Sequence, residues 1–220
     1  MARFLESEKK RLAEYKNSTS HLSSAAREPG VYKNHVYPHV LPRDLSSENL
    51  YGGFRTQALA YFDRNAIKWH DAIDRRPSNH LCDSQVCSVN FLFAFHDQPE
   101  ALAALLRPVF PEIRRMLPVE DGQFVAFEWI GAENYLGERK SPNRKRARGA
   151  LFTSADAAVM FERDDGQKQF VLIEWKYTES YYPTWLKFSK SGTDRTQIYR
   201  HLYDRADCPL DKDLLSSRVR

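Results

Sequence analysis

The chain has 220 residues, the length of one domain of good size or of a domain with an additional arm. Hydrophobic residues make up 42% of it, aromatic residues 13% and charged residues 28%, so a packed core is expected and bulk disorder is excluded. The net charge of +4 is concentrated in a basic segment, residues 139–148, which holds six cations and no acid. Without this segment, 27 basic residues face 29 acidic ones, a net charge of −2.

The chain lacks the marks of membrane and secreted proteins. No apolar run reaches the roughly 18 residues of a membrane span, and the first residues do not resemble a signal peptide. Cys82, Cys87 and Cys208 make an odd, low number of cysteines that suits reduced thiols rather than a disulfide framework. We therefore expect a soluble, cytoplasmic protein.

Residues 1–50 are expected to form an N-terminal helical arm, and residues 51–220 the main domain. The sparse apolar positions of residues 2–16 predict a charged amphipathic helix. Residues 18–33 are rich in serine and interrupted by a Pro-Gly pair, which indicates a linker. Two X-Pro steps then favour an extended chain to about residue 45.

Three helices are predicted next. The first covers residues 54–73, where apolar residues recur at helical spacing: Leu59, Phe62, Ala66, Trp69 and Ile73. The second begins near Asp83 or Ser84, either of which is a good N-cap, and runs through Phe95. The third begins after Asp97 and ends before Pro108.

Strands follow over residues 124–130, 155–162 and 168–177, and Asp165-Gly166 predicts a tight hairpin turn between the last two. A final helix is expected to carry Gln197. Helices followed by strands and another helix indicate an α/β (mixed α+β) fold, with a central mixed sheet of about four strands flanked by helices.

The chemistry concentrates at Asp156, Glu174 and Lys176. Glu174 and Lys176 are two positions apart on one strand and therefore share a face. A hairpin loop centred on Asp165 makes opposed residue numbers sum to 330, which places Asp156 opposite Glu174, roughly 5 Å away between Cβ atoms; a two-residue loop shifts this register by one position. Two carboxylates this close favour a cation between them, and Mg²⁺ with its preference for oxygen ligands is the natural candidate. Lys176 either neutralises the acids as a structural ion pair or stabilises charge at a reacting phosphate.

An aspartate near the start of one strand and a Glu-x-Lys at the end of the next resemble the PD-(D/E)XK nuclease superfamily. Further segments resemble a restriction-endonuclease-like bacterial branch of it, so that about residues 35–210 are similar. The residues that carry the resemblance are Ser154 to Ala157, Ile173 to Glu179, Trp69-His70, His80 to Leu92 and Phe127 to Ile130.

The resemblance implies a restriction-endonuclease-like core and a metal-dependent nuclease that hydrolyses phosphodiester bonds. DNA is favoured over RNA as its substrate. Asp156 and Glu174 would ligate Mg²⁺ or Mn²⁺, and Lys176 would orient the attacking water. Glu128 would be a further metal ligand, the alternative being an exposed residue on an alternating strand. Gln85, at the start of a helix, would face the metal.

The basic segment is expected to contact nucleic-acid phosphates, because it lies between the strands of Glu128 and Asp156. Its alternative is a solvated loop. Gln197 is another candidate nucleic-acid contact by resemblance, with a surface polar residue as the alternative. The cations concerned are Arg139, Lys140, Arg144, Lys145, Arg146 and Arg148.

Zinc and thiol chemistry are disfavoured. His80, Cys82 and Cys87 are close in sequence, with His70 upstream, but the two cysteines have no second pair and Cys87 falls in an apolar helix. A cysteine-protease pair lacks a third orienting group. The sequence also contains neither a glycine-rich phosphate loop nor a GxSxG motif.

Two other functions compete with the nuclease. A catalytically silent nucleic-acid-binding protein would keep the fold and the basic segment without turnover. A carboxylate-pair glycoside hydrolase would need no metal and gives Lys176 no purpose. The resemblance implies a further strand and helix beyond the Gln197 region, and the short sequence after Pro209 puts the completeness of the domain at its C-terminal end in question. The oligomeric state is left open, a homo-oligomer included.

Overall fold

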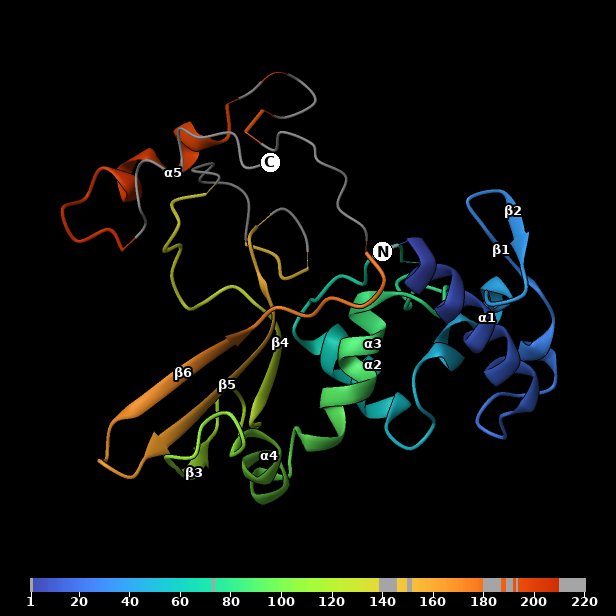
Figure 1. Ribbon diagram of the computed structural model, residues 1–220, viewed down its shortest axis with the longest axis horizontal. Coiled ribbons are helices and arrows are strands. Elements are labelled where there is room, and N and C mark those ends of the chain that lie inside the picture. Colours follow the sequence, from blue (N-terminus) through green and yellow to red (C-terminus); the bar gives the residue numbers. More distant parts are fainter. Residues whose placement is uncertain are drawn as a thin grey trace. The chain divides into compact units, whose positions relative to one another are not determined.

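The computed structural model describes most of the chain, and it divides into two units. One comprises Met1–Trp129 and Arg146–Glu179, the other Ile130–Lys145 and Ser180–Arg220. The first unit holds the sheet and the N-terminal helices (Figure 1), and the second holds the helix α5 (Thr196–Tyr203). The described residues are 2–72, 74–138, 146–149, 152–179, 187–188, 192 and 194–209.

A four-stranded sheet forms the centre of the first unit. Its strands are β3 (Ile113–Leu117), β4 (Val125–Trp129), β5 (Ala155–Arg163) and β6 (Lys168–Ile173). β5 lies in the middle, with β6 along one edge and with β4 and β3 along the first and second parts of the other. All pairs among these described strands are antiparallel, so the expected mixed sheet is wrong for them. The tight turn after β5 dictates this direction for β6.

The β5–β6 hairpin has the predicted register. Opposed residue numbers sum to 330 from Ala157↔Ile173 to Glu162↔Lys168. Gly166 adopts a φ of +80° in the turn, a conformation that glycine reaches without steric cost. The register centred on Asp165 is therefore confirmed.

The sequence did not predict β3. Its Arg114 and Arg115 interrupt the apolar pattern, but both bind the carboxylate of Glu162 on β5, at 2.9 Å and 2.6 Å. β3 is therefore stabilised by cross-strand ion pairs. It lacks the alternation of apolar and polar residues by which a strand is usually recognised in a sequence.

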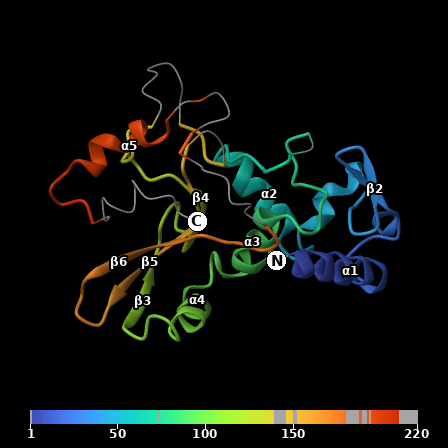
Figure 2. The ribbon, with the colours of Figure 1, turned by 45° about the horizontal axis from the view of Figure 1, so that its top comes forward.

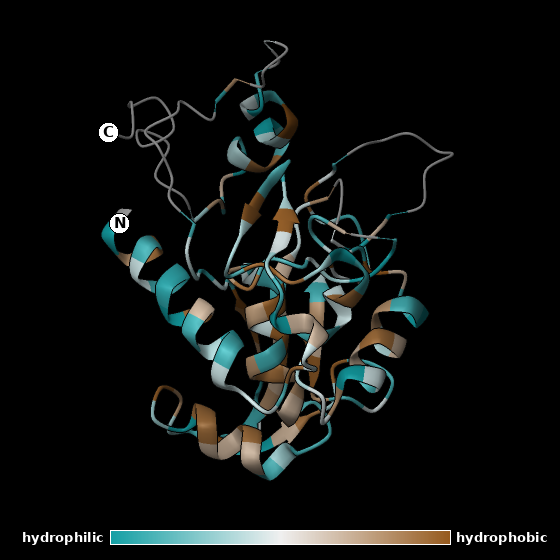
Figure 3. Cartoon of the chain, turned by 90° about the vertical axis from the view of Figure 1, so that its right-hand side faces the viewer, coloured by the Kyte–Doolittle hydropathy of each residue, from teal (hydrophilic) through white to brown (hydrophobic). Residues whose placement is uncertain are grey.

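The core lies between one face of the sheet and the helices α2 (Arg55–Arg64), α3 (Ser84–Leu92) and α4 (Pro99–Leu106). Apolar segments of the strands and helices gather there (Figure 3). The residues that β4 and β5 contribute to this face are odd-numbered: Val125, Phe127, Ala157, Val159 and Phe161. On the other face, Phe170 and Leu172 of β6 are exposed.

The helix predicted over residues 54–73 is wrong in its second half, because α2 ends at Arg64. Ala66 has a φ of +51°, a left-handed conformation that a helix does not continue through. The returning chain lays the ring of Trp69 flat on Phe62, with 3.7 Å between ring centroids. The apolar spacing therefore reflects core packing rather than a continuous helix.

The other two predicted helices are confirmed. Asp83 caps α3, and its side chain accepts a hydrogen bond from the backbone N–H of Val86. A 3₁₀ turn, η3 (Phe93–Phe95), extends α3, and α4 begins at Pro99. Its N-cap is Gln98 rather than Asp97.

The N-terminal elements group together beside α2 and α3 (Figure 2). The predicted first helix is α1 (Ala2–Ser18), but the linker and extended chain expected next are wrong. Residues 25–49 form short strands and 3₁₀ turns, although their serine and proline residues are typical of a linker. These elements are η1 (Ala25–Arg27), β1 (Gly30–Tyr32), β2 (His35–Tyr37) and η2 (Arg43–Asn49).

Polar contacts hold α1 in place. Among its described side chains, Glu8 and Lys16 are the buried ones, and both are charged. The ammonium group of Lys16 donates to the carbonyl oxygens of Glu28 and Val40, each at 2.6 Å. The Tyr177 hydroxyl donates to Glu8 and in turn accepts from Arg11.

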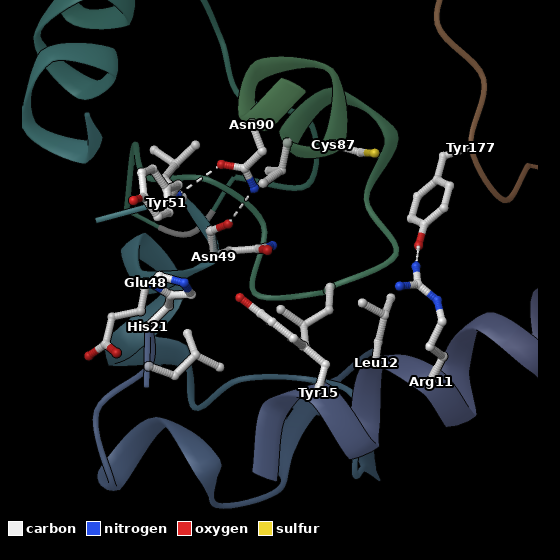
Figure 4. Close-up of a pocket in the computed structure, with 14 residues that line it drawn as sticks. Arg11, Leu12, Tyr15, His21, Glu48, Asn49, Tyr51, Cys87, Asn90 and Tyr177 are labelled. Atoms are coloured by element: carbon white, nitrogen blue, oxygen red, sulfur yellow. Dashed lines mark hydrogen bonds between the residues drawn. The ribbon is translucent and has the colours of Figure 1, made fainter. Parts of the chain in front are cut away.

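A cavity of about 340 Å³ separates α1 from α3 (Figure 4). Leu12 and Tyr15 line it from α1. On the opposite side, the Asn90 side chain donates to the Asn49 carbonyl and accepts from the Tyr51 backbone, at 2.8 Å and 2.9 Å. The boundary between α1 and the core is thus partly hollow and partly polar.

In the second unit, the hydroxyl of Tyr199 on α5 donates to the carboxylate of Glu138 at 2.5 Å. None of the helices described in either unit has the length and apolarity needed to cross a membrane.

Candidate active site

The end of the β5–β6 hairpin places two of the predicted acids opposite each other in the register. The last ladder pair is Ala157↔Ile173, so the same register carries Asp156 opposite Glu174, one position beyond the end of β6. The carboxylate of Asp156 accepts a hydrogen bond from the backbone N–H of Trp175 at 2.6 Å. Asp156 is therefore fixed against the segment that carries Glu174.

Glu174 and Lys176 lie outside the strand proper. β6 ends at Ile173, so the strand predicted over residues 168–177 is wrong in its last four residues. The side chains of Glu174 and Lys176 are 62% and 46% exposed. They form an ion pair with each other. Because both are accessible, they can meet a ligand that approaches from solvent.

The pKa of Asp156 is raised above its ordinary value. Partial burial raises its pKa most, and the carboxylates of Glu174 and Glu128 raise the pKa further. The Trp175 N–H and the ammonium of Lys176 lower the pKa but do not outweigh these effects. A raised carboxyl pKa with specific charged neighbours is typical of functional sites and of sites that attract cations.

Glu128 is buried rather than exposed, which excludes the alternative of a solvent-facing strand residue. One carboxylate oxygen accepts from the side-chain amide of Gln85 and the other from the hydroxyl of Ser154, both at 2.6 Å. Gln85 was expected at the site, whereas the contact of Ser154 was not predicted. Its position two residues before Asp156 was the available signal.

The backbone of Glu128 has a left-handed conformation, with a φ of +48°. β4 pairs with β5 on both sides of it, through Phe127↔Ala157 and Trp129↔Ala155. Such a conformation is unfavourable for a residue with a side chain and occurs where the surroundings impose it, commonly at functional sites. It lets the side chain leave the regular alternation and reach Gln85.

Arg148 supports this irregular point of β4. Its guanidinium donates to the carbonyl oxygens of Phe127 and Glu128, at 3.0 Å and 3.2 Å from Nε. It also binds Glu120 at 2.9 Å and the hydroxyl of Tyr61 at 2.9 Å. Its side chain is only 12% exposed, so these contacts contrast with the phosphate contact expected for it.

The chain here is tightly packed around the end of the basic segment. Lys68 donates its backbone N–H to the Arg148 carbonyl at 3.1 Å. A Cβ atom on Gly149, where φ is +67°, would lie 2.4 Å from the Lys68 carbonyl oxygen, so this position requires glycine. Arg146 lies over the ring of Phe152 at 6.0 Å, and residues 139–145 fall outside the described part of the chain.

One comparison decides the family. The family model described as "Restriction Endonuclease associating with ARP" matches residues 9–219. The chain belongs to this restriction endonuclease family. No curated protein and no solved structure matches it significantly.

Within this family member, Gln85 links three parts of the site. Its amide nitrogen donates to the Lys68 carbonyl at 3.1 Å as well as to Glu128, and its oxygen accepts from the His70 backbone at 2.7 Å. Both the nitrogen and the oxygen of the Gln85 amide group are thus hydrogen-bonded. Gln85 is placed by the first turn of α3, which Asp83 caps.

Gln197 lies on α5 in the second unit. Its backbone N–H donates to the Asp194 carbonyl at 3.3 Å. The pKa of Asp194 is lowered mainly by the Thr196 hydroxyl, which donates to the Asp194 carboxylate at 2.6 Å. The expected contact of Gln197 with nucleic acid stays a prediction, as do those of the cations in the basic segment.

Proposed function

We propose that this restriction endonuclease family member is a metal-dependent nuclease of the PD-(D/E)XK type that hydrolyses phosphodiester bonds in DNA. The observation that carries the proposal is the register of the β5–β6 hairpin, which sets Asp156 opposite Glu174 with Lys176 alongside. Exposure of Glu174 and Lys176 supports access by a large polyanionic substrate.

The donor set fits a hard divalent cation. Asp156, Glu174 and Glu128 supply only carboxylate oxygens, the ligands that Mg²⁺ and Mn²⁺ prefer. The mutual effect of these carboxylates on the pKa of Asp156 is also what a cation would relieve. When bound, such an ion would polarise the phosphate and lower the pKa of a coordinated water.

The protein's own groups would then position the reactants. Lys176 supplies a positive charge beside the acids, where it can hold a water for attack and offset negative charge that develops on the phosphate. Its ion pair with Glu174 keeps the ammonium at this place before substrate arrives. Trp175 fixes Asp156 through its backbone N–H.

The side chain of Glu128 would be oriented by hydrogen bonds from two neighbouring residues. Gln85 and Ser154 each hold one of its carboxylate oxygens, so its rotation is restricted. Residues that orient metal ligands in this way commonly change metal affinity by 10- to 100-fold when they are removed. In this proposal Gln85 and Ser154 are positioning residues.

DNA would be held by cations of the basic segment, which follows β4 and precedes β5. Arg139, Lys140, Arg144, Lys145 and Arg146 would contact phosphates, and Gln197 would contribute a further polar contact. Arg148 would serve instead to position β4. Phosphate contacts of this kind predict binding that weakens steeply with salt and carries little sequence preference.

Cleavage of supercoiled plasmid DNA tests the proposal. We expect cleavage with Mg²⁺ or Mn²⁺, none with EDTA, and a loss of at least about 100-fold in Asp156→Ala and Lys176→Ala. Asp165→Asn and Lys168→Ala are matched controls, because both residues are exposed on the same hairpin and asparagine keeps the turn chemistry of Asp165. Unchanged cleavage in Asp156→Ala and Lys176→Ala would contradict the site, and metal-independent DNA binding without cleavage would support the silent binding protein.

A further inference from the structure

Away from the carboxylates, three side chains with metal-binding chemistry converge in the N-terminal half of the first unit. These are His39, His80 and Cys82, and one ligand atom of each lies within 4.8 Å of those of the other two. The sequence pairs His80 with Cys82, but His39 is 41 residues upstream of His80 and becomes a neighbour only through the fold. Cys87, the other cysteine of the sequence-based hypothesis, is not part of the group.

The backbone fixes this convergence. Val40 forms an antiparallel bridge with His80, and Leu81 donates its N–H to the His39 carbonyl at 3.4 Å. The stretch after β2 is therefore paired with the turn that leads into α3. His80 and Cys82 are placed by that turn, and His39 is held opposite them.

His39 carries the observation that points to a ligand. It is only 3% exposed, and its Nε2 has no hydrogen-bond partner among the residues that the structure describes. A buried ring nitrogen without a partner is costly, because it has lost its hydration without a replacement. Burial and the neighbouring His80 also lower the pKa of His39 to about 4, so the ring is neutral and offers a lone pair near pH 7.

The surroundings leave room for a ligand. A cavity of about 320 Å³ is lined by His39, His80 and Cys82 together with His70 and Asp83. The rings of Tyr32 and Tyr37 pack against His80 and His39, with ring centroids 4.7 Å and 5.4 Å apart. The three donors thus face an open space and are backed by aromatic rings.

We propose that His39, His80 and Cys82 bind a Zn²⁺ ion, with a water from the adjacent cavity as the fourth ligand. Two imidazole nitrogens and one thiolate are a borderline-soft donor set that selects Zn²⁺ over the hard cations of the carboxylate site. Zinc bonds of about 2.0 to 2.3 Å in a tetrahedron place the donor atoms roughly 3.5 Å apart. A modest inward movement of the three side chains reaches this geometry.

Binding requires two local changes, which shape the test. Cys82 is buried, which raises the pKa of its thiol to about 11, so the thiol must release its proton to the medium when it ligates. Nδ1 of His80 accepts a hydrogen bond from the Cys82 backbone at 3.1 Å. Ligation through this nitrogen replaces that hydrogen bond with a metal bond.

The ion would join segments that are otherwise distant in the chain. His39 belongs to the N-terminal stretch, whereas His80 and Cys82 directly precede α3, whose Gln85 contacts Glu128. The zinc proposal does not depend on the nuclease proposal, because its residues and its readout are different.

The experiment uses full-length protein without a histidine tag. Zn²⁺ binding is measured by competition with a chromophoric chelator, and Co²⁺ is substituted to detect a thiolate charge-transfer band. We expect one ion per chain, a thiolate band, and an affinity at least about 100-fold lower in Cys82→Ser and His39→Gln. Cys87→Ser and His35→Gln are matched controls that keep the wild-type affinity.

Two results would contradict the zinc site. The proposal is overturned if the wild type binds no more Zn²⁺ than Cys82→Ser, or if Cys87→Ser loses as much affinity as Cys82→Ser. If Cys82→Ser does not fold, the double variant Cys87→Ser/Cys208→Ser decides, because Cys82 is then the sole cysteine. A thiolate band with Co²⁺ in that variant supports the site, and its absence rejects it.

Discussion

The side-chain amide of Gln85 donates a 2.6 Å hydrogen bond to the carboxylate of Glu128, joining the first turn of α3 to β4. The same amide is held by the backbones of Lys68 and His70, so it is rigid before any ligand binds. The Glu128 carboxylate is therefore held in one orientation.

Gln85→Ala is expected to lower metal-dependent cleavage by about 10- to 100-fold, because Glu128 loses one of the groups that orient it. The dependence on Mg²⁺ concentration should shift to higher values. Plasmid cleavage across a Mg²⁺ titration measures both. Gln57→Ala, on the exposed side of α2, is the control; an equal loss in both variants would argue against a positioning role.

Asp156→Asn is expected to abolish cleavage while stabilising the metal-free protein. The pKa of Asp156 is raised in the folded state, so its ionised form disfavours folding at pH values above the ordinary pKa of an aspartate. The gain should appear as a Tm above that of the wild type. Thermal melts in EDTA at neutral pH measure this.

Acid conditions provide the check on that explanation. Below the ordinary aspartate pKa both states are protonated, so the stability difference between Asp156→Asn and the wild type should disappear. Asp165→Asn, on the exposed hairpin turn, should show no gain at either pH. A gain that persists in acid would show that the effect is not electrostatic.

Arg148→Ala is expected to lower the free energy of unfolding by about 3 kcal/mol or more, because Glu120 then remains partly buried without its charged partner. Urea denaturation measures the loss. Arg205→Ala, an exposed ion-pair partner of Asp207, should change stability little. If Arg148→Ala instead keeps its stability and loses DNA affinity, Arg148 is a phosphate contact.

His39 gives the metal-free protein a pH dependence of defined sign. Its folded pKa of about 4 is below its ordinary value of 6.5. Below pH 6.5 the unfolded chain takes up the proton first, so the contribution of neutral His39 to stability is lost as the pH falls from 6.5 towards 4. His80, Lys9 and Lys16 disfavour its charged form, whereas Glu6 favours it.

Denaturation curves between pH 7 and pH 4 in the presence of a chelator test this dependence. His39→Gln should make the loss of stability in this range shallower, by up to about 1.4 kcal/mol for each unit of pKa shift removed. His35→Gln, on the exposed side of β2, should keep the wild-type slope. Parallel slopes for all three proteins would contradict the assignment to His39.

Local signals account for what could be predicted from the sequence. Asp165-Gly166 fixes a hairpin turn, and the turn fixes the register that opposes Asp156 and Glu174. Asp83 caps the start of α3 because its carboxylate accepts a hydrogen bond from the Val86 N–H. In both cases the deciding interaction spans only a few residues.

The missed features depend on contacts between distant segments. β3 forms because its arginines find Glu162, 47 and 48 residues away. The irregular backbone at Glu128 is supported by Arg148, and His39 reaches Cys82 only through the pairing of Val40 with His80. Contacts between segments so far apart in the chain leave no periodicity or spacing in the sequence from which they could be predicted.

The attachment of α1 has a consequence for heat resistance. Tyr177, which binds Glu8 and Arg11, directly follows Lys176 in the chain, and α1 is held by polar contacts beside a cavity. A helix with so little apolar anchorage opens at a lower free energy than the sheet. Its fraying would release the segment of Lys176, so nuclease activity should fade several degrees below the melting of the core.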